Sequence, residues 1–171
     1  KKIQWFSNSE NNDENWLHIN TPISYLGKIK LSDNILKNKK LDPTYRKKHL
    51  DIIVNSWING KFKHSDEKYI LKYYSSSLTQ LDHAKRLDNL IWSKNWKHAK
   101  RQLKRVSEEY SKLAIARIKL ARRSYGVDEA VSKVPINLKN DEGLVYERIR
   151  WRRISNLRES SLQMLKHYLS N

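Results

Sequence analysis

Acidic side chains are the residues of this chain that could carry acid–base chemistry. Cleavage of a glycosidic bond needs two carboxylates placed around the bond, or one carboxyl group with a shifted pKa. The chain has three adjacent acidic pairs, each where a helix is expected to begin: Asp66-Glu67, Glu108-Glu109 and Asp141-Glu142. Capping and the helix dipole explain acidic residues at such positions. The pairs therefore predict helix starts, and no catalytic residue is expected among them.

The histidines show no metal-binding pattern. His83 and His98 are isolated, and no His-x-x-x-His or His-Glu-x-x-His spacing occurs. The chain has no cysteine, so it offers no thiolate ligand, and it has no phosphate-binding glycine loop. We therefore expect no metal and no cofactor. His83 falls on an apolar helix stripe, which predicts a packed, hydrogen-bonded histidine.

Arginine is the charged residue whose spacing repeats. Arg86, Arg117 and Arg148 are 31 positions apart. Stacked helices would place them in a row at intervals of about 10 Å, the helix packing distance. Two interpretations stay open. Each arginine pairs with a nearby acid, such as Asp82 one turn before Arg86, or the row, together with Arg152, forms a surface for an anionic ligand or a partner domain.

Small and apolar residues share the same 31-residue spacing. The recurring triplets are Leu87, Ile118 and Ile149, then Ala99, Ala130 and Ser161, then Leu103, Val134 and Leu165. Such recurrence over three copies is typical of stacked helical hairpins, which cannot bury their apolar faces alone. We therefore predict an all-α fold: a right-handed α-superhelix, an array of helical-hairpin repeats similar to tetratricopeptide arrays.

Local signals divide the chain into an N-terminal segment at residues 1–41 and a helical-repeat domain at residues 42–171. The first segment is expected to be partly irregular, with a polar loop from Ser7 to Asn15, an extended stretch at 16–19 and a short helix from Ile29 to Leu36. Helix-capping signals become regular from Asp42-Pro43 onward, and three later helices are expected to begin after the caps Thr79, Ser107 and Asp141. The repeats are expected at about 79–106, 107–138 and 141–170.

The formal net charge is +17 over 171 residues. A basic excess of this size attracts polyanions such as nucleic acid, anionic lipid or acidic cell-wall polymer. The basic residues are spread along the chain, so a dispersed solvated surface explains the charge at least as well. No run approaches the roughly 18–20 apolar residues of a membrane helix, so no membrane span is expected. The chain begins at Lys1 without a signal segment, as a processed product would.

Spaced residues between about 45 and 170 form a pattern more specific than a short motif. The pattern comprises Leu78-Thr79, Asp82-His83, Arg86-Leu87-Asp88, Leu90 and Trp92, then Ala116-Arg117-Ile118 and Leu120, and finally Asp141 to Arg148 with Arg150-Trp151-Arg152-Arg153. It resembles the helical-array domain of soluble lytic murein transglycosylases in their proteobacterial form. The resemblance implies a non-catalytic α-superhelix in the periplasm, which contacts peptidoglycan strands and a separate C-terminal catalytic domain.

In that family the catalytic domain is lysozyme-like and cleaves the glycan without water, using one Glu followed by Ser. Glu159-Ser160 superficially resembles that pair, and Gln163-Met164 resembles a neighbouring family motif in reversed order. Only eleven residues follow Ser160, too few to build a glycan cleft. We expect Glu159 to be a solvated helix residue, with Leu162 and Leu165 in the core of the last hairpin.

The sequence therefore predicts the scaffold and peptidoglycan-binding portion of a periplasmic lytic transglycosylase that acts in murein turnover, without the catalytic module in this chain. One alternative is a tetratricopeptide-like adaptor that binds a protein partner. A nucleic-acid binder is less favoured, because the tryptophans follow helical core spacing and no RNA-binding motif occurs.

Overall fold

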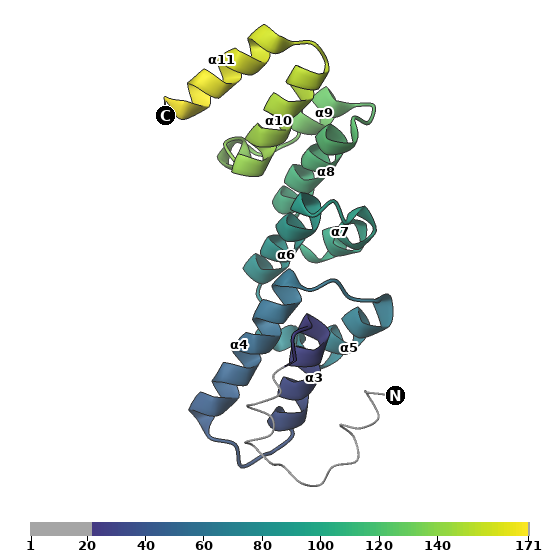
Figure 1. The fold of residues 1–171 in the computed structure, drawn as a ribbon, viewed down its shortest axis with the longest axis vertical. Coiled ribbons are helices and arrows are strands. Elements are labelled where there is room, and N and C mark those ends of the chain that lie inside the picture. Colours follow the sequence, from purple (N-terminus) through teal and green to yellow (C-terminus); the bar gives the residue numbers. More distant parts are fainter. Residues whose placement is uncertain (1–21, 171) are drawn as a thin grey trace. The chain divides into compact units, whose positions relative to one another are not determined.

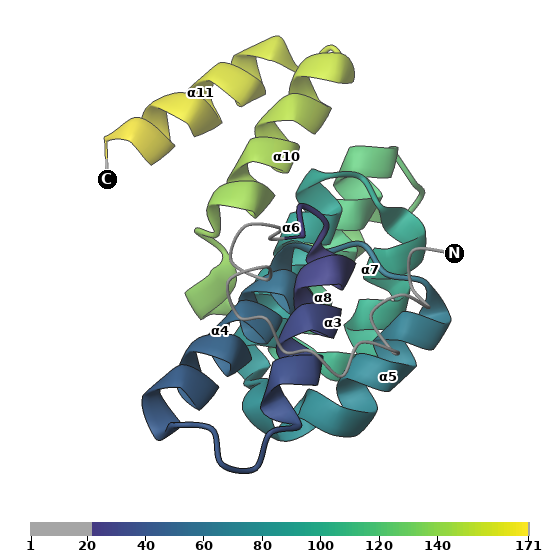
Figure 2. The same cartoon turned by 60° about the horizontal axis from the view of Figure 1, so that its bottom comes forward.

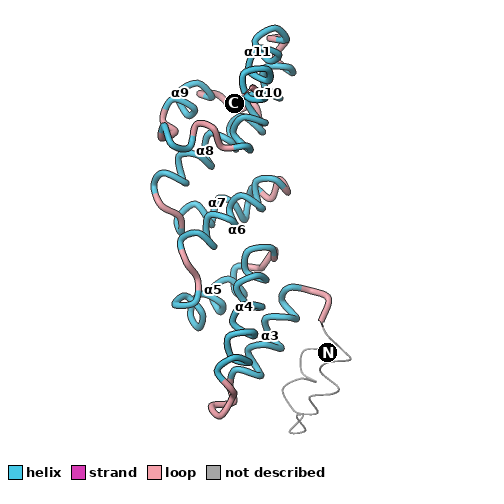
Figure 3. Tube along the Cα trace, turned by 90° about the vertical axis from the view of Figure 1, so that its left-hand side faces the viewer, coloured by secondary structure: helices cyan, strands magenta, loops and turns pink. Residues whose placement is uncertain are grey.

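The computed structural model describes residues 22–170, and within this range it contains helices and loops but no strand (Figures 1 and 3). The predicted all-α class is confirmed. The predictions for Ser7 to Asn15 and for residues 16–19 lie outside the described residues. The chain divides into two compact units, Lys1–Ser56 and Trp57–Asn171. The division at residue 41, which is drawn from sequence character, stays a prediction.

The first unit contains α3 (Tyr25–Leu36) and most of α4 (Pro43–Asn59). Ser24 caps α3, because its Oγ accepts a hydrogen bond from the backbone N–H of Gly27 at 3.1 Å. The predicted helix at 29–36 is thereby confirmed and begins earlier. Asp42 caps α4, since its Oδ1 accepts from the N–H of Thr44 at 2.8 Å. Both helices start where a side-chain oxygen meets their free N–H groups.

A buried polar contact joins these two helices. The Oγ of Ser32 on α3 lies 3.1 Å from Nδ1 of His49 on α4, and both residues are buried. Nearby, Arg46 Nη2 donates to the carbonyl of Asn38 at 2.9 Å, in the loop between the helices. These bonds fix the α3–α4 pair within the first unit.

The second unit begins at the end of α4 and continues through seven α-helices within the described range. They are α5 (His64–Tyr74), α6 (Gln80–Trp92), α7 (Trp96–Gln102), α8 (Glu108–Arg122), α9 (Val127–Ser132), α10 (Glu142–Ile154) and α11 (Arg158–Leu169). Short 3₁₀ turns follow α5 and α7 at Ser75–Ser77 and Leu103–Arg105, and a third lies at Ile136–Leu138. Helix α8 contacts both α6 and α10, while α7, α9 and α11 return beside α6, α8 and α10.

Side-chain caps set the start of every second helix in this unit. Thr79 and Asp82 form a complete capping box at α6. Ser107 Oγ accepts from the N–H of Tyr110 at α8. Asp141 Oδ1 accepts from the N–H of Leu144 at 2.8 Å at α10. The predicted caps of these three helices are therefore confirmed.

Two apolar clusters hold the second unit together. The first joins α6, α7 and α8 through Leu87, Leu90, Ile91, Ala99 and Ala114, with Ile118 packed against them. The second joins α8, α9 and α10 through Leu113, Ala116, Leu120, Val127, Ala130, Val134 and Leu144, with Val131, Leu138 and Trp151 packed against them. Because α8 contributes to both clusters, it is the element on which the neighbouring helix pairs assemble.

Helix α11 departs from the sequence prediction. Figures 1 and 2 show it leaving the end of α10 at an open angle. Leu162 and Leu165, which were expected in a core, are 51% and 39% exposed. The prediction is wrong for these two residues, because helical spacing selects a face of the helix but does not supply a neighbour to cover it.

Candidate functional site

Arg86 is fully buried, at 0% exposure. Its guanidinium group donates from Nη1 to the carbonyls of Trp57 and of Gly60, the latter at 2.6 Å, and from Nη2 to Glu67 Oε1 at 3.3 Å. The group also lies over the Trp57 ring, 4.1 Å from its centroid. Arg86 therefore ties α6 to the end of α4 and to α5. Its expected partner, Asp82, is instead engaged in the capping box with Thr79.

Glu67 is the centre of this ionic cluster. Arg101 binds it with two hydrogen bonds, from Nε at 2.8 Å and from Nη2 at 3.0 Å, and Arg105 Nη2 lies 3.8 Å from Oε2. Burial raises the pKa of Glu67, but the hydrogen bond from Arg101 and the charges of the three arginines outweigh burial and leave the pKa below its ordinary value. Burial lowers the pKa of Arg86 to about 10, which leaves it charged at neutral pH. One carboxylate thus links three helices: α5, which carries it, α6, and α7 with its 3₁₀ extension.

His83 is a packed histidine, as its position on the apolar stripe predicts. Trp57 Nε1 donates to its Nδ1 at 3.3 Å, so the neutral ring carries its proton on Nε2. Gln102 Nε2 lies 3.2 Å from the same nitrogen and donates to the His83 carbonyl at 3.1 Å. Burial lowers the pKa of His83, and the positive charges of Arg105 and Arg86 act in the same direction. The ring is therefore suited to a fixed neutral role.

Arg117 is also buried, at 3% exposure. Its Nη1 bonds to Asp88 on α6 and lies 3.4 Å from Oδ1 of Asp141, the N-cap of α10. The guanidinium lies 5.3 Å from the centroid of Trp92. A Cβ atom built on Gly143 would lie 2.1 Å from its Cζ, so α10 passes directly against the charged group. Arg117 holds α8 between α6 and α10.

Arg148 and Arg152 differ from the two buried arginines. Both are half-buried on α10. Arg152 donates from Nε to Ser160 Oγ at 3.0 Å and lies 3.5 Å from Met164 Sδ, so it bridges to α11. Burial and, to a lesser extent, the charge of Arg152 lower the pKa of Arg148. Among residues 22–170 no carboxylate lies within ion-pair distance of Arg148.

The four predicted site residues therefore do not form one exposed row. Arg86 and Arg117 are interior residues whose charges are met by carboxylates and carbonyls, so their predicted place on a ligand-binding surface is corrected. Ligand or partner binding by Arg148 and Arg152 stays a prediction. Glu159 is exposed in the first turn of α11, where its Oε1 accepts from Gln163 Nε2 at 3.5 Å.

A hollow of about 220 Å³ lies over Arg117, between α6 and α8. Its walls are mostly apolar and include Leu81 and Tyr110. The charged part consists of Arg117 and Lys85 with Asp88 and Asp141. Because both carboxylates already neutralise the arginine, this hollow suits an apolar group better than an anion.

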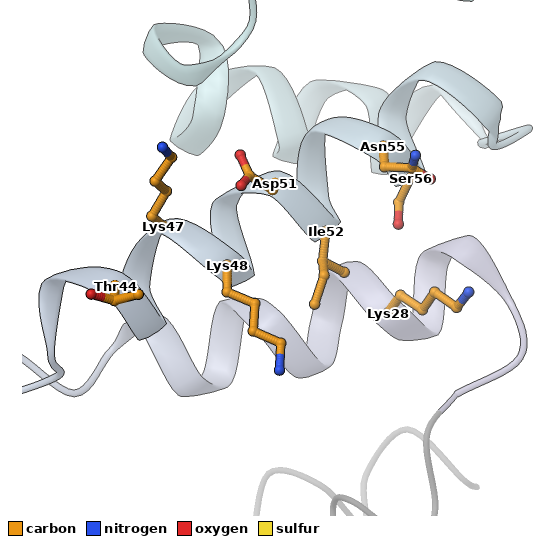
Figure 4. A pocket seen from close by; sticks show the side chains of 8 residues that line it. All are labelled: Lys28, Thr44, Lys47, Lys48, Asp51, Ile52, Asn55 and Ser56. Carbon is orange, nitrogen blue, oxygen red and sulfur yellow. The ribbon is translucent and has the colours of Figure 1, made fainter.

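A second hollow, of about 520 Å³, lies in the first unit between α3 and α4 (Figure 4). Three lysines line it: Lys28 from α3, and Lys47 and Lys48 from successive positions of α4. Asp51 is the acidic residue of the lining, and Thr44, Ile52, Asn55 and Ser56 complete it. Figure 4 shows Lys48 and Ile52 extending toward the same side of α4, while Lys47 and Asp51 extend toward the other. The excess of ammonium groups favours an anionic or hydroxyl-rich ligand.

Between residues 22 and 170, no three side chains of the metal-binding types gather as ligands would. Over the same residues, no helix has both the length and the apolar character needed to cross a bilayer. Comparison with models of protein families, with curated proteins and with solved structures gives no match for this chain.

Sequence reasoning missed Glu67, although a signal for it exists. Because Glu67 follows Asp66 directly, the acidic pair suggests a helix start, and α5 does begin at His64. However, Glu67 stands three positions before Ile70 and seven before Tyr74, both buried. That spacing places its carboxylate on the buried face of the helix. An acid on an apolar stripe predicts a basic partner in the interior.

Proposed function

We propose that this chain is a non-catalytic helical scaffold built from hairpin repeats, whose role is to bind and position another molecule. The observation that carries the proposal is the use of Arg86 and Arg117. These residues are one 31-residue step apart. Each is buried, joins its own helix to a preceding helix by hydrogen bonds, and has its guanidinium group over a tryptophan ring. A recurring residue used for assembly supports an array of structural units.

Loop geometry gives independent support for the repeats. Lys94 and Asn156 are two 31-residue steps apart, and both have positive φ, 56° and 61°. The turns around them share one backbone bond at matching positions, from Asn95 N to the Leu90 carbonyl at 2.8 Å and from Leu157 N to the Arg152 carbonyl at 2.9 Å. Left-handed backbone at a non-glycine residue is uncommon, so the coincidence supports two copies of one hairpin turn.

The small residues Ala99, Ala130 and Ser161 support the same register, since all three are buried at the start of the second helix of a pair. We propose that these pairs form the right-handed α-superhelix expected from the sequence. The resemblance to the superhelical domain of soluble lytic murein transglycosylases directs the function toward the periplasm and murein turnover. The partners proposed on this basis are peptidoglycan strands and a lysozyme-like catalytic domain outside this chain.

The net charge and the hollow lined by Lys28, Lys47 and Lys48 support binding to an anionic polymer of sugars and peptides. In the test, the purified chain is mixed with isolated sacculi and sedimented. We expect the chain to pellet with sacculi, and a variant with all three lysines changed to Gln to pellet several-fold less. The matched control changes Lys97, Lys100 and Lys104 to Gln, which removes the same charge from exposed positions elsewhere.

Three outcomes would contradict this proposal. The chain stays in the supernatant, or both triple variants lose binding equally, which would indicate dispersed charge attraction alone. Release of anhydro-muropeptides from the sacculi would contradict the non-catalytic part.

A protein adaptor is the second candidate, and exposed aromatic residues favour it. Trp92 and Tyr146, from α6 and α10, are about half exposed with ring centroids 5.2 Å apart. Amphipathic aromatic rings are enriched at protein interfaces. Saturable binding to a protein, without binding to sacculi, would favour this function.

A further inference from the structure

Helix α11 exposes a stripe of three leucines. Leu162, Leu165 and Leu169 are 51%, 39% and 74% exposed. Their spacing of three and four places them on one side of the helix. At 1.5 Å of rise per residue the stripe is roughly 10 Å long, the length of about two helical turns. Single exposed leucines are ordinary, but three in register form a face.

The positions one 31-residue step earlier have the opposite environment. Val131, Val134 and Leu138 pack into the apolar cluster of α8, α9 and α10. Leu144 and Trp151 of α10 belong to that cluster, so the following helix closes the interior at this place. The apolar face of the α8–α9 pair is thus covered by a helix, whereas the matching face of the α10–α11 pair is open in the described residues.

The covering helix, α10, also places a carboxylate next to a buried arginine. Asp141, the N-cap of α10, lies 3.4 Å from the buried Arg117 of the pair that it covers. Arg148 is the matching arginine of the next pair, and it has no ion-pair partner among residues 22–170. Its neighbour Arg152 is turned to Ser160 and adds positive charge. A half-buried guanidinium without a carboxylate favours the arrival of an anion.

We propose that the α10–α11 pair binds an amphipathic α-helix of a partner protein. Apolar side chains of that helix pack against Leu162, Leu165 and Leu169, and a carboxylate in its first turn pairs with Arg148. The inference rests on the repeat register of the proposed function. The occupant is a helix because that is what covers the equivalent face one step earlier. Its acid end follows from charge complementarity with Arg148 and Arg152.

The test uses the full chain and a helical peptide as probe. The peptide has the sequence of residues 140–154, the segment that covers the preceding pair, with Arg152→Gln and Arg153→Gln. It then carries one net negative charge, from Asp141, Glu142 and Glu147 against Arg148 and Arg150. Binding is measured by fluorescence anisotropy of the labelled peptide.

We expect saturable binding that weakens about tenfold or more in the Leu165→Lys chain, because a charged group then enters an apolar contact. Leu165 is partly exposed, so this variant should keep the fold, which circular dichroism checks. Ile136→Lys is the matched control, since Ile136 is an exposed apolar residue outside α11, and it should bind as the native chain does. The Arg148→Gln chain should bind more weakly, and Asp141→Asn in the peptide should weaken binding to the native chain but not to Arg148→Gln.

No binding of the peptide at millimolar concentration would overturn the inference. Equal binding by the native and Leu165→Lys chains would also overturn it, because the peptide would then occupy another place. So would Leu165-dependent binding to vesicles with phosphatidylserine in place of the peptide, which would identify a bilayer surface. Sacculus sedimentation of Leu165→Lys separates the two proposals, since the lysines between α3 and α4 remain intact in that variant.

Discussion

Gly143 and Arg117 show how one hydrogen atom in place of a side chain decides a contact. Alanine favours a helical backbone over glycine, by up to about 1 kcal/mol in a helix interior, so Gly143 in the first turn of α10 calls for a packing reason. The reason is the guanidinium of Arg117, which lies where a Cβ atom would be, with Cζ at 2.1 Å from the Cβ position. The missing side chain lets the charged group lie against the helix beside its cap, Asp141.

Gly143→Ala should therefore destabilise the protein by about 1–3 kcal/mol, although alanine is the better helix former. The added methyl group must displace a buried guanidinium and disturb its bonds to Asp88 and Asp141. Urea denaturation followed by circular dichroism measures the change in the free energy of unfolding. In an Arg117→Met background the same change should be neutral or stabilising. A penalty that persists in that background would show that the contact is not its cause.

Glu67 acts at the scale of helices, because one carboxylate holds Arg86 of α6, Arg101 of α7 and Arg105 of the following 3₁₀ turn. Glu67→Gln keeps the size of the side chain and removes its charge. We expect a loss of about 3–5 kcal/mol in the free energy of unfolding, because Arg86 remains buried without a counter-charge. The same substitution at Glu108, an exposed acid paired with Lys112, is the control. Equal effects of the two substitutions would contradict a special role for the cluster.

The starts of α6, α8 and α10 were predictable from sequence, because capping is local. Thr79, Ser107 and Asp141 each accept from an N–H group three residues away, and each cap lies where it was expected. The partner of Arg86 was not predictable in this way. Asp82 is nearer in sequence, but the capping box holds it, and burial of Arg86 favours Glu67, 19 positions away. Such a choice depends on how helices pack.

The sequence correctly predicted which residues share an apolar helix face, but not whether each face is buried. The 31-residue spacing correctly places Leu87 in the interior, and Ile118 packs against the same cluster. The same spacing puts Leu165 on a regular stripe, yet 39% of its surface stays exposed. Periodicity shows which face of a helix is apolar. Whether that face is buried depends on another element, which the periodicity of the helix does not describe.

The whole molecule carries a large positive charge, which makes its stability sensitive to acid. Protonation of any histidine adds to a net charge of +17 and so increases self-repulsion in the compact state. Two histidines have an additional effect. Burial lowers the pKa of His83 and of His98, and in the same direction the charge of Arg105 acts on His83 and that of Arg101 on His98. For both, the folded state takes up a proton less readily than the unfolded state.

Stability should therefore fall as the pH is lowered from about 8 to about 5.5. The contribution of His83 is fully present above the ordinary histidine pKa of about 6.5 and is lost as the pH falls through the lower value of the folded state. His83→Asn retains an acceptor for the Trp57 N–H but cannot titrate, so it should lower stability at pH 8 and flatten the pH dependence. His64→Asn, at an exposed position, is the control, because it removes a histidine without touching the buried ring. Thermal unfolding at several pH values measures both slopes. An unchanged slope in His83→Asn would mean that self-repulsion of the whole chain, and not this buried ring, sets the response to acid.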